Sequence, residues 1–242
     1  MIIIFSSSNS PAHNLATEEY LFSNRNDDIL FLYVNEPCVV VGRNQDVLSE
    51  VNVEYCTTRK IPVFKRMSGG GTVYHDLGNL NYCFISNRVP GELPLNDVFL
   101  QPIVAVLHDL QVDVLIGKRN DLWLPGGHKI SGTASHVGKT RILHHGTLLY
   151  DADLDNLEKS LSAKAVDIKS RAIASVPSPV KNIRTYLMEK KLFAPSSESF
   201  FELLIQKLLD RYCQESASEV NTKEISTIRP LDPVILTSLI FP

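Results

Sequence analysis

The residue types that could do chemistry gather first in Arg66–Asn79 (RMSGGGTVYHDLGN). The three successive glycines Gly69–Gly71 allow backbone conformations that other residues avoid, and they let a ligand approach the backbone N–H groups. Arg66 offers a guanidinium fork that suits a phosphate or a carboxylate. Because the segment is neither GxxxxGK[ST] nor GxGxxG, it is not a P-loop or a dinucleotide fingerprint. It predicts an anion-binding loop, with a ligand-free glycine hairpin as the alternative.

A second segment, Lys129–Ala134 (KISGTA), follows Arg119–Asp121 (RND). A lysine beside small residues on a mid-sheet strand could direct its ammonium into a pocket, where it would neutralise a phosphate and polarise a carbonyl. A solvated hairpin lysine is the alternative. Asp76 and Asp121 are candidate Mg²⁺ ligands, because Mg²⁺ prefers one or two carboxylates together with substrate phosphates. Capping of turns is the alternative role for both.

Two serines lie in these segments, but neither has the surroundings of a hydrolase nucleophile. A nucleophile elbow requires the pattern GxSxG. Arg66 and Lys129 stand where the first glycine would have to precede Ser68 and Ser131. The sequence therefore argues against serine hydrolase chemistry of this kind.

The cysteines and the paired histidines do not predict a metal site. Four cysteines lie far apart without a CxxC pair, which disfavours a zinc knuckle or a disulfide framework: Cys38, Cys56, Cys83 and Cys213. Cys83 lies in an apolar strand and is expected in the core, and the stretch from there to Cys213 contains no thiol nucleophile. On a strand, His144 and His145 would face opposite sides, so they are not expected to share one ion.

Apolar runs and helical spacing indicate the elements that must position these residues. Strands are predicted over 1–5, 29–34, 39–41, 61–66 and 80–85, followed by a meander over 112–116, 121–124, 129–134 and 142–150. Helices are predicted over 14–23 with Asn14 as N-cap, then 52–59, 98–110, 153–161, 182–190 and 197–213. Residues 164–181 read as a functional or flexible loop. Strands on both sides of one long helix, without regular βαβ alternation, favour an α+β fold.

Length and composition narrow the function further. The chain has 242 residues, of which 44% are hydrophobic and 21% charged, enough for one sizeable core. The net charge of −3 disfavours a nucleic-acid partner, and no apolar run is long enough for a membrane span. The first residues lack the features of a signal or transit peptide, so we expect a cytoplasmic protein, or an organellar one only if a targeting segment is absent from this sequence.

Taken together and in order, the two segments, the HHGTLL run and the stretch 171–182 (RAIASVPSPVKN) resemble lipoate-protein ligase A and the related lipoyltransferases. The resemblance covers roughly residues 10–190 and rests on the glycine-rich block followed by the KISGTA block. It implies a biotin/lipoate-ligase-like α+β catalytic domain, which we expect over 1–213, with a polar linker (216–227) and an apolar tail within 214–242. It also implies lipoyl acceptor domains, of the H-protein or dehydrogenase E2 kind, as partners.

The reaction implied by this resemblance has two steps, with ATP and Mg²⁺ required for the first. Lipoate attacks the α-phosphate of ATP to give lipoyl-AMP, and an acceptor lysine then displaces AMP. Lys129 would be the central catalytic cation, and Asp121 would place the metal or the incoming lysine. The expected substrate- and nucleotide-binding residues are Arg66, Ser68, Gly69, Gly70, Gly71, Tyr74, His75, Asp76, Asn79, Ser131, Gly132 and Ala134. The expected adenylate-binding loop contains Lys169, Arg171 and Ser175.

Three alternatives remain open at this point. Only about thirty residues follow Cys213, too few for the accessory domain of many family ligases. The protein could therefore act with a separate accessory subunit, accept preformed lipoyl-AMP, or move lipoyl groups between proteins. Octanoyl transfer is disfavoured by the missing pocket cysteine, and biotin ligation by the missing GRGRxGR-like loop. The three alternatives are therefore these forms of lipoyl transfer, attachment of a different acyl group, and a catalytically idle module that binds lipoyl-AMP or lipoyl domains.

Overall fold

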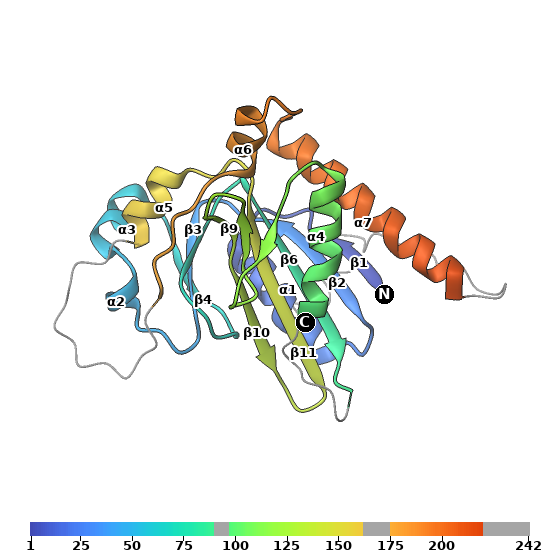
Figure 1. The fold of residues 1–242 in the computed structure, drawn as a ribbon. Helices are drawn as coiled ribbons and strands as arrows, with labels where there is room; N and C mark the ends of the chain where they lie inside the picture. Colours follow the sequence, from blue (N-terminus) through green and yellow to red (C-terminus); the bar gives the residue numbers. More distant parts are fainter. Residues whose placement is uncertain (90–96, 162–174, 220–242) are drawn as a thin grey trace.

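A computed structural model describes residues 1–89, 97–161 and 175–219 of the chain (Figure 1). Its centre is a five-stranded sheet in the order β1-β2-β6-β11-β10. These strands are β1 (Ile2–Phe5), β2 (Ile29–Val34), β6 (Asn79–Asn87), β10 (Thr133–Val137) and β11 (Arg141–Leu149). Strands β1 and β2 are parallel and the other neighbours are antiparallel. The sheet register places Tyr33, Asn81 and Thr147 side by side across three strands.

Two three-stranded sheets complete the β-structure. One has the order β4-β3-β5 and consists of β3 (Cys38–Val41), β4 (Val63–Lys65) and β5 (Val73–His75). The other has the order β7-β8-β9 and consists of β7 (Leu115–Ile116), β8 (Leu122–Leu124) and β9 (His128–Ser131). The predicted meander is therefore divided, because the chain leaves the small sheet after β9 and enters the central sheet as β10. β9 is the last strand of its sheet rather than a mid-sheet strand, although Lys129 also bridges to Val180.

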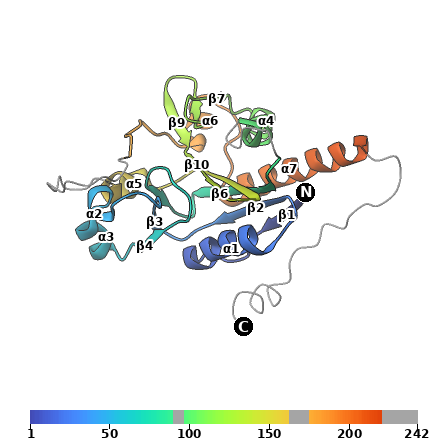
Figure 2. The same cartoon turned by 90° about the horizontal axis from the view of Figure 1, so that it is seen from below.

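Helices cover both faces of the central sheet. They are α1 (Pro11–Asn24), α2 (Val47–Glu50), α3 (Val53–Arg59), α4 (Gln101–Asp109), α5 (Leu154–Leu161), α6 (Ile183–Glu189) and α7 (Ser197–Glu219). A 3₁₀ turn over Asp97–Leu100 precedes α4, so the predicted amphipathic helix is present with a tighter first turn. Figure 2 shows α1 on one face of the sheet, and α4 and α7 on the other. None of the helices that the structure describes has the length and apolar character needed to cross a lipid bilayer.

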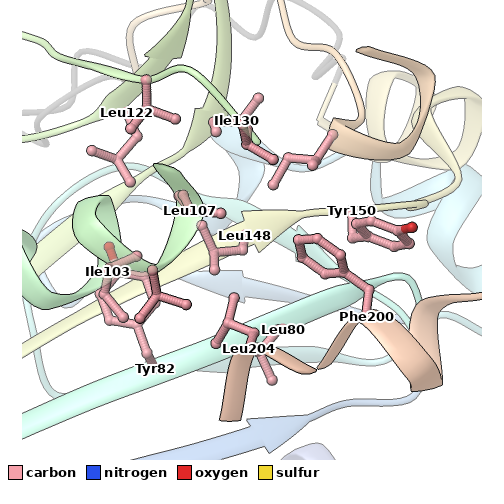
Figure 3. Close-up of a cluster of buried hydrophobic side chains, with 14 of the residues drawn as sticks. Leu80, Tyr82, Ile103, Leu107, Leu122, Ile130, Leu148, Tyr150, Phe200 and Leu204 are labelled. Carbon is pink, nitrogen blue, oxygen red and sulfur yellow. The ribbon is translucent and has the colours of Figure 1, made fainter. Parts of the chain in front are cut away.

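The alternation of β6 divides the core between these two faces. Tyr82 and Phe84 join the larger apolar cluster under α4 and α7, whereas Cys83 and Ile85 join the cluster under α1. In Figure 3 the larger cluster brings Leu204 of α7 against strand residues of the sheet. Each fully buried large apolar side chain stabilises the fold by about 1.5–3 kcal/mol relative to an exposed one. The alternation also confirms that Cys83 belongs to the core.

Two predicted boundaries are wrong for identifiable reasons. Helix α1 begins at Pro11, because Ser10 caps it by accepting a hydrogen bond from His13 N and proline is favourable in a first turn. Asn14, the predicted N-cap, is instead a fully buried residue inside the helix. Helix α7 continues to Glu219, so residues 216–219 of the predicted linker are helical, as expected where neither glycine nor proline interrupts the run. The predicted apolar tail lies outside the described residues.

Candidate active site

A cavity of about 430 Å³ lies where the three sheets meet, on the α1 side of the central sheet. It is lined by nine of the residues predicted for the site: Arg66, Gly70, Gly71, His75, Asp121, Lys129, Gly132, Ala134 and Ser175. We call Arg119, Asp121 and Lys129 its open end, since the Arg119 and Lys129 side chains remain 50% and 20% exposed. We call the group Tyr33, His75, Asn81 and His145 its buried end, since all four are almost inaccessible to solvent.

The open end concentrates charge on one carboxylate oxygen. Asp121 Oδ2 lies 3.3 Å from Lys129 Nζ and 3.6 Å from Arg119 Nη2, and it has no further hydrogen-bond partner among the described residues. Burial lowers the pKa of Lys129 from its ordinary value, although Asp121 opposes this shift. Burial alone would raise the pKa of Asp121, but a hydrogen bond from Trp123 and the charge of Lys129 lower it. Asp121 is therefore ionised at neutral pH, and the Lys129 side chain beside it lines the cavity.

The strand around Lys129 explains why its side chain faces the cavity. Alternation along β9 places Ile130 in the larger core and Lys129 on the opposite side. The Lys129 N–H donates to Pro179 O at 2.8 Å, and the Lys181 N–H donates to Lys129 O at 3.2 Å. The backbone on both sides of the catalytic candidate is thus fixed by residues 179–181, at the C-terminal end of the predicted adenylate loop (164–181).

Arg66 differs from the expected free guanidinium fork. It lines the cavity, yet it donates from Nε to Ser68 Oγ, from Nη1 to Val40 O, and from Nη2 to Gly69 O and Gly71 O. Burial lowers its pKa to about 10. Residues of the glycine-rich loop accept hydrogen bonds from most of the Arg66 donors that a ligand would use. Arg66 therefore holds that loop in its conformation. Gly70 adopts φ +81°, which explains a glycine there.

Two residues of the buried end, Tyr33 and His145, belong to a buried hydrogen-bond network with Glu18 and Ser68. His145 Nε2 lies 2.7 Å from Ser68 Oγ, and its Nδ1 lies 3.0 Å from a Glu18 carboxylate oxygen. Tyr33 donates its hydroxyl to Glu18 at 3.0 Å. Burial would raise the pKa of Glu18, but the charge and hydrogen bond of His145 and the bond from Tyr33 lower it. The network joins α1, β2, β11 and the glycine-rich loop.

The two histidines of β11 face opposite sides, as the alternation predicted. His145 lines the cavity, whereas His144 lies 2.7 Å from Ser135 Oγ and stacks on Phe99 beneath the other face. Burial lowers the pKa of His144 to about 4. Among the described residues, Glu18, Cys83 and His145 could offer three ligand atoms to one ion, but Glu18 and His145 already hydrogen-bond each other.

Ser175 ties the end of the predicted adenylate loop to the glycine-rich loop. Its Oγ accepts hydrogen bonds from Gln45 Nε2 at 2.9 Å and from Thr72 N at 3.0 Å. Its backbone N–H donates to Glu50 Oε1 at 3.0 Å. Lys169 and Arg171, the other two residues expected in this loop, lie outside the described residues.

Six predicted residues lie outside the cavity wall: Ser68, Gly69, Tyr74, Asp76, Asn79 and Ser131. Alternation on β5 explains one of them, because His75 faces the cavity while Tyr74 joins the small core beside β3. Asp76 accepts hydrogen bonds from Gly78 N and Asp153 N, so it caps turns as the alternative reading proposed. Asn79 donates to Asn81, and Ser131 lies 3.3 Å from the Tyr82 hydroxyl.

The remaining cavity residues escaped the predicted site: Leu15, Tyr33, Val40, Thr72, Val73, Asn81, Arg119, Thr133, His145, Gly146, Thr147 and Val176. Val40 belongs to the strand predicted over 39–41, and Arg119 was recognised as part of the RND motif. Asn81 could have been predicted as a site residue, because it is a polar residue inside an apolar strand. Leu15 and Glu18 gave no such signal, because helix α1 reads as an ordinary covering helix.

The sequence of this chain is similar to those of lipoate-protein ligases and lipoyl transferases. The family model described as "Lipoyl protein ligase A/B catalytic domain" matches residues 10–209. Lipoate-protein ligase LplJ of Bacillus subtilis is 40% identical over 184 residues, which are 75% of this chain and 55% of that protein. Human mitochondrial lipoyl amidotransferase LIPT1 is 41% identical over 187 residues, 75% of this chain and 49% of that protein. The chain spans about half the length of these curated relatives.

Solved structures share the same fold. A bipartite lipoate protein ligase from Thermoplasma acidophilum, studied with its E2 lipoyl domain, superposes with a TM-score of 0.75 at 22% identity, covering 99% of this chain and 89% of that chain. A lipoate-protein ligase A bound with ATP superposes with a TM-score of 0.72 at 21% identity, covering 99% of this chain and 92% of that chain. These likenesses confirm the predicted α+β fold class.

Proposed function

Because this chain belongs to the lipoyl protein ligase A/B catalytic domain family, we propose that it attaches lipoate to a lysine of a lipoyl acceptor domain. The observation that carries the proposal is the Lys129 side chain, which lines a cavity whose wall also contains the buried side chains of Tyr33, His75, Asn81 and His145. An acyl chain bound there would have its carboxyl group at the cation and its tail away from water. The names of the sequence relatives support the same substrate class.

In the first proposed step, a lipoate carboxylate oxygen attacks the α-phosphorus of ATP. A new P–O bond forms, the bond to the β-phosphate oxygen breaks, and pyrophosphate leaves. Negative charge develops on the phosphoryl oxygens, where the Lys129 ammonium would stabilise it. The likeness to an ATP-bound lipoate-protein ligase A supports ATP as the activating nucleotide.

In the second proposed step, the amine of the acceptor lysine attacks the acyl carbon of lipoyl-AMP. A C–N bond forms, the C–O bond to AMP breaks, and charge develops on the carbonyl oxygen beside the same ammonium. Asp121 would accept a hydrogen bond from the incoming amine, because its carboxylate stays ionised at the open end. One fixed cation thus serves both steps.

The described residues do not form a Mg²⁺ site by themselves. Asp121 is the single acidic residue among those that line the cavity, and two cations already flank its Oδ2. Asp76, the other predicted ligand, uses both carboxylate oxygens to accept backbone N–H groups. Mg²⁺ needs unshared carboxylate or phosphate oxygens, so no step is assigned to it here.

Whether the chain activates lipoate itself is the finer part of the proposal. We favour an ATP-dependent ligase that forms lipoyl-AMP, and the similarity to LplJ supports this choice. The similarity to lipoyl amidotransferase LIPT1 supports the alternative, transfer from preformed lipoyl-AMP or from a lipoylated donor protein.

Intact mass of an apo lipoyl domain distinguishes these readings. One reaction contains the full chain with lipoate, ATP and Mg²⁺, and a second contains synthetic lipoyl-AMP. Each is run in parallel with Lys129→Ala, which should abolish most of the gain. A lipoyl mass gain in both wild-type reactions supports the ligase, and a gain with lipoyl-AMP alone supports the transferase. No gain in either, with E2-type and H-protein-type acceptors, would overturn the proposed function.

A further inference from the structure

One polar atom at the buried end is left without a partner. His75, on β5, lines the cavity and is 4% exposed. Its Nδ1 lies 3.0 Å from Asn35 Nδ2, but its Nε2 has no hydrogen-bond partner among the described residues. Buried polar atoms of side chains are nearly always paired in native proteins, so an orphan in a cavity wall points to a ligand.

The polar groups behind His75 fix which nitrogen carries the proton. Asn14 Nδ2 donates to the Ser8 carbonyl at 2.9 Å, and a carbonyl can only accept. The same amide nitrogen therefore also donates to Asn35 Oδ1 at 2.8 Å, which leaves Asn35 Nδ2 facing His75. Asn35 must donate there, so His75 Nδ1 is the acceptor and the neutral ring carries its proton on Nε2.

The charge state of His75 follows from its surroundings. Burial lowers its pKa to about 3, and the electrostatic influence of Arg66 and His145 acts in the same direction. Glu18 acts in the opposite direction but does not reverse the shift. At neutral pH the ring is therefore an uncharged N–H donor, which can pair with a neutral acceptor.

The other polar side chains of the buried end are already paired. Tyr33 donates to Glu18, and His145 contacts Ser68 and Glu18 through its two ring nitrogens. Asn81 donates to Tyr33 O and accepts from Asn79. Within the part of the chain that the structure describes, His75 Nε2 is the one buried side-chain N or O atom of this end that has no hydrogen-bond partner.

The position of His75 determines which part of an acyl ligand it meets. An acyl group whose carbonyl lies against Lys129 at the open end must extend its tail toward the buried end. The distal part of a lipoyl group is a dithiolane, whose sulfurs are weak neutral acceptors, whereas an octanoyl chain ends in a methyl group. Only the lipoyl tail can use an N–H donor there.

We propose that His75, through its Nε2–H, donates a hydrogen bond to a dithiolane sulfur and thereby makes this site select lipoyl over octanoyl groups. The inference rests on the proposed function and names the residue that would set its acyl specificity. An octanoyl tail would leave the N–H buried and unpaired, which disfavours it. We expect a preference on the order of 10-fold, the size of one hydrogen bond lost to an unpaired buried donor.

The experiment compares transfer from synthetic lipoyl-AMP and octanoyl-AMP to an apo lipoyl domain, which bypasses activation. The ratio of the two kcat/KM values is measured for wild type, His75→Phe and His75→Gln. His75→Phe keeps a ring but removes the donor, so the ratio should fall from about 10 to near 1, because lipoyl transfer loses a hydrogen bond and octanoyl transfer no longer leaves a donor unpaired. His75→Gln places an amide N–H near the position of Nε2 and should retain part of the preference. His136→Phe, a histidine replaced outside the cavity wall, should leave the ratio unchanged.

Several outcomes would overturn the inference while leaving the proposed function intact. A wild-type ratio near 1 would do so, as would an equal loss of both activities in His75→Phe, which indicates a structural role. If His75→Phe does not fold, ¹⁵N NMR of the wild-type imidazole replaces it: lipoate should shift the Nε2–H resonance and octanoate should not. Equal shifts contradict the inference. By contrast, no transfer of either acyl group would overturn the proposed function itself.

Discussion

The two ends of the cavity use their charged groups in opposite ways. At the open end, Lys129 and Arg119 share one carboxylate oxygen at 3.3 and 3.6 Å and keep part of their surface exposed. Behind the buried end, Glu18 is enclosed and its oxygens are shared between His145 and Tyr33. Charge that is incompletely paired remains available to a ligand, whereas charge that is fully paired holds elements together. Substitutions at the open end should therefore impair catalysis, and those behind the buried end should impair folding.

Glu18→Ala tests the structural half of this contrast and should have the largest effect. Removing the carboxylate leaves the His145 ring and the Tyr33 hydroxyl buried without their shared partner, a loss of about 3–5 kcal/mol in the free energy of unfolding. Urea denaturation at neutral pH measures this value. Glu19→Ala, the exposed neighbour on the same helix, should change it by less than about 0.5 kcal/mol.

The pH dependence of this difference has a defined sign. The Glu18 pKa is lowered from 4.5 in the folded protein, so its ionisation stabilises the fold above that value. As the pH falls below 4.5 toward the folded pKa, the carboxylate is protonated and this contribution disappears. The gap between wild type and Glu18→Ala should therefore narrow in acid. A gap that is small at neutral pH would contradict a structural role for the network.

Lys129→Ala tests the catalytic half. Loss of the ammonium should reduce lipoyl transfer by about 2–4 kcal/mol of transition-state stabilisation, or roughly 30- to 1,000-fold in rate. The free energy of unfolding should change little, because the side chain is not enclosed. Single-turnover transfer from lipoyl-AMP measures the rate. Lys181→Ala removes a lysine that pairs with Glu189 on the adjoining segment, and it should keep nearly full activity. A stable Lys129→Ala enzyme with an unchanged rate would show that Lys129 is not the catalytic cation.

Asp121→Asn tests the influence of Asp121 on Lys129, the two residues that form an ion pair at the open end. The Lys129 pKa is lowered by burial, and Asp121 partly restores it. Neutralising the carboxylate should lower that pKa further, so the ammonium is lost at lower pH. The alkaline limb of kcat/KM should move to lower pH relative to wild type. Asp113→Asn, whose carboxylate accepts a bond from Tyr186, should leave the limb in place. A limb that moves upward would show that Lys129 is not the titrating group.

The same contrast explains what the sequence could and could not predict. The open end was predicted because its residues lie in two short segments, and local patterns report such segments directly. Strand β2, helix α5 and helix α6 were placed within about two residues for the same reason. The glycine-rich loop was also located, although its arginine was assigned to a ligand rather than to the loop's own carbonyl groups.

Apart from His75, the residues of the buried end were missed, because their contacts join distant parts of the chain. The bond between Glu18 and His145 spans 127 positions, and that between Asn35 and His75 spans 40. No spacing rule connects such pairs before the sheet order is known. Asn14 illustrates the difficulty, since an asparagine near a helix start is a good cap, and only the tertiary structure shows it donating to Asn35.

Ser175→Ala tests the contact between the adenylate loop and the glycine-rich loop, and it should have the smallest effect. It removes an oxygen that accepts from Gln45 and from the Thr72 N–H, so the end of the adenylate loop is held less firmly on the glycine-rich loop. The loss should be about 0.5–1.5 kcal/mol. We expect dissociation of lipoyl-AMP to become two- to tenfold faster, as measured by stopped flow. The free energy of unfolding should change little. Ser178→Ala removes an exposed hydroxyl that donates within its own turn and should leave dissociation unaltered. Equal dissociation rates in both variants would mean that the Ser175 contact does not help to hold lipoyl-AMP. Binding of lipoyl-AMP would then depend on the open end and the buried end alone.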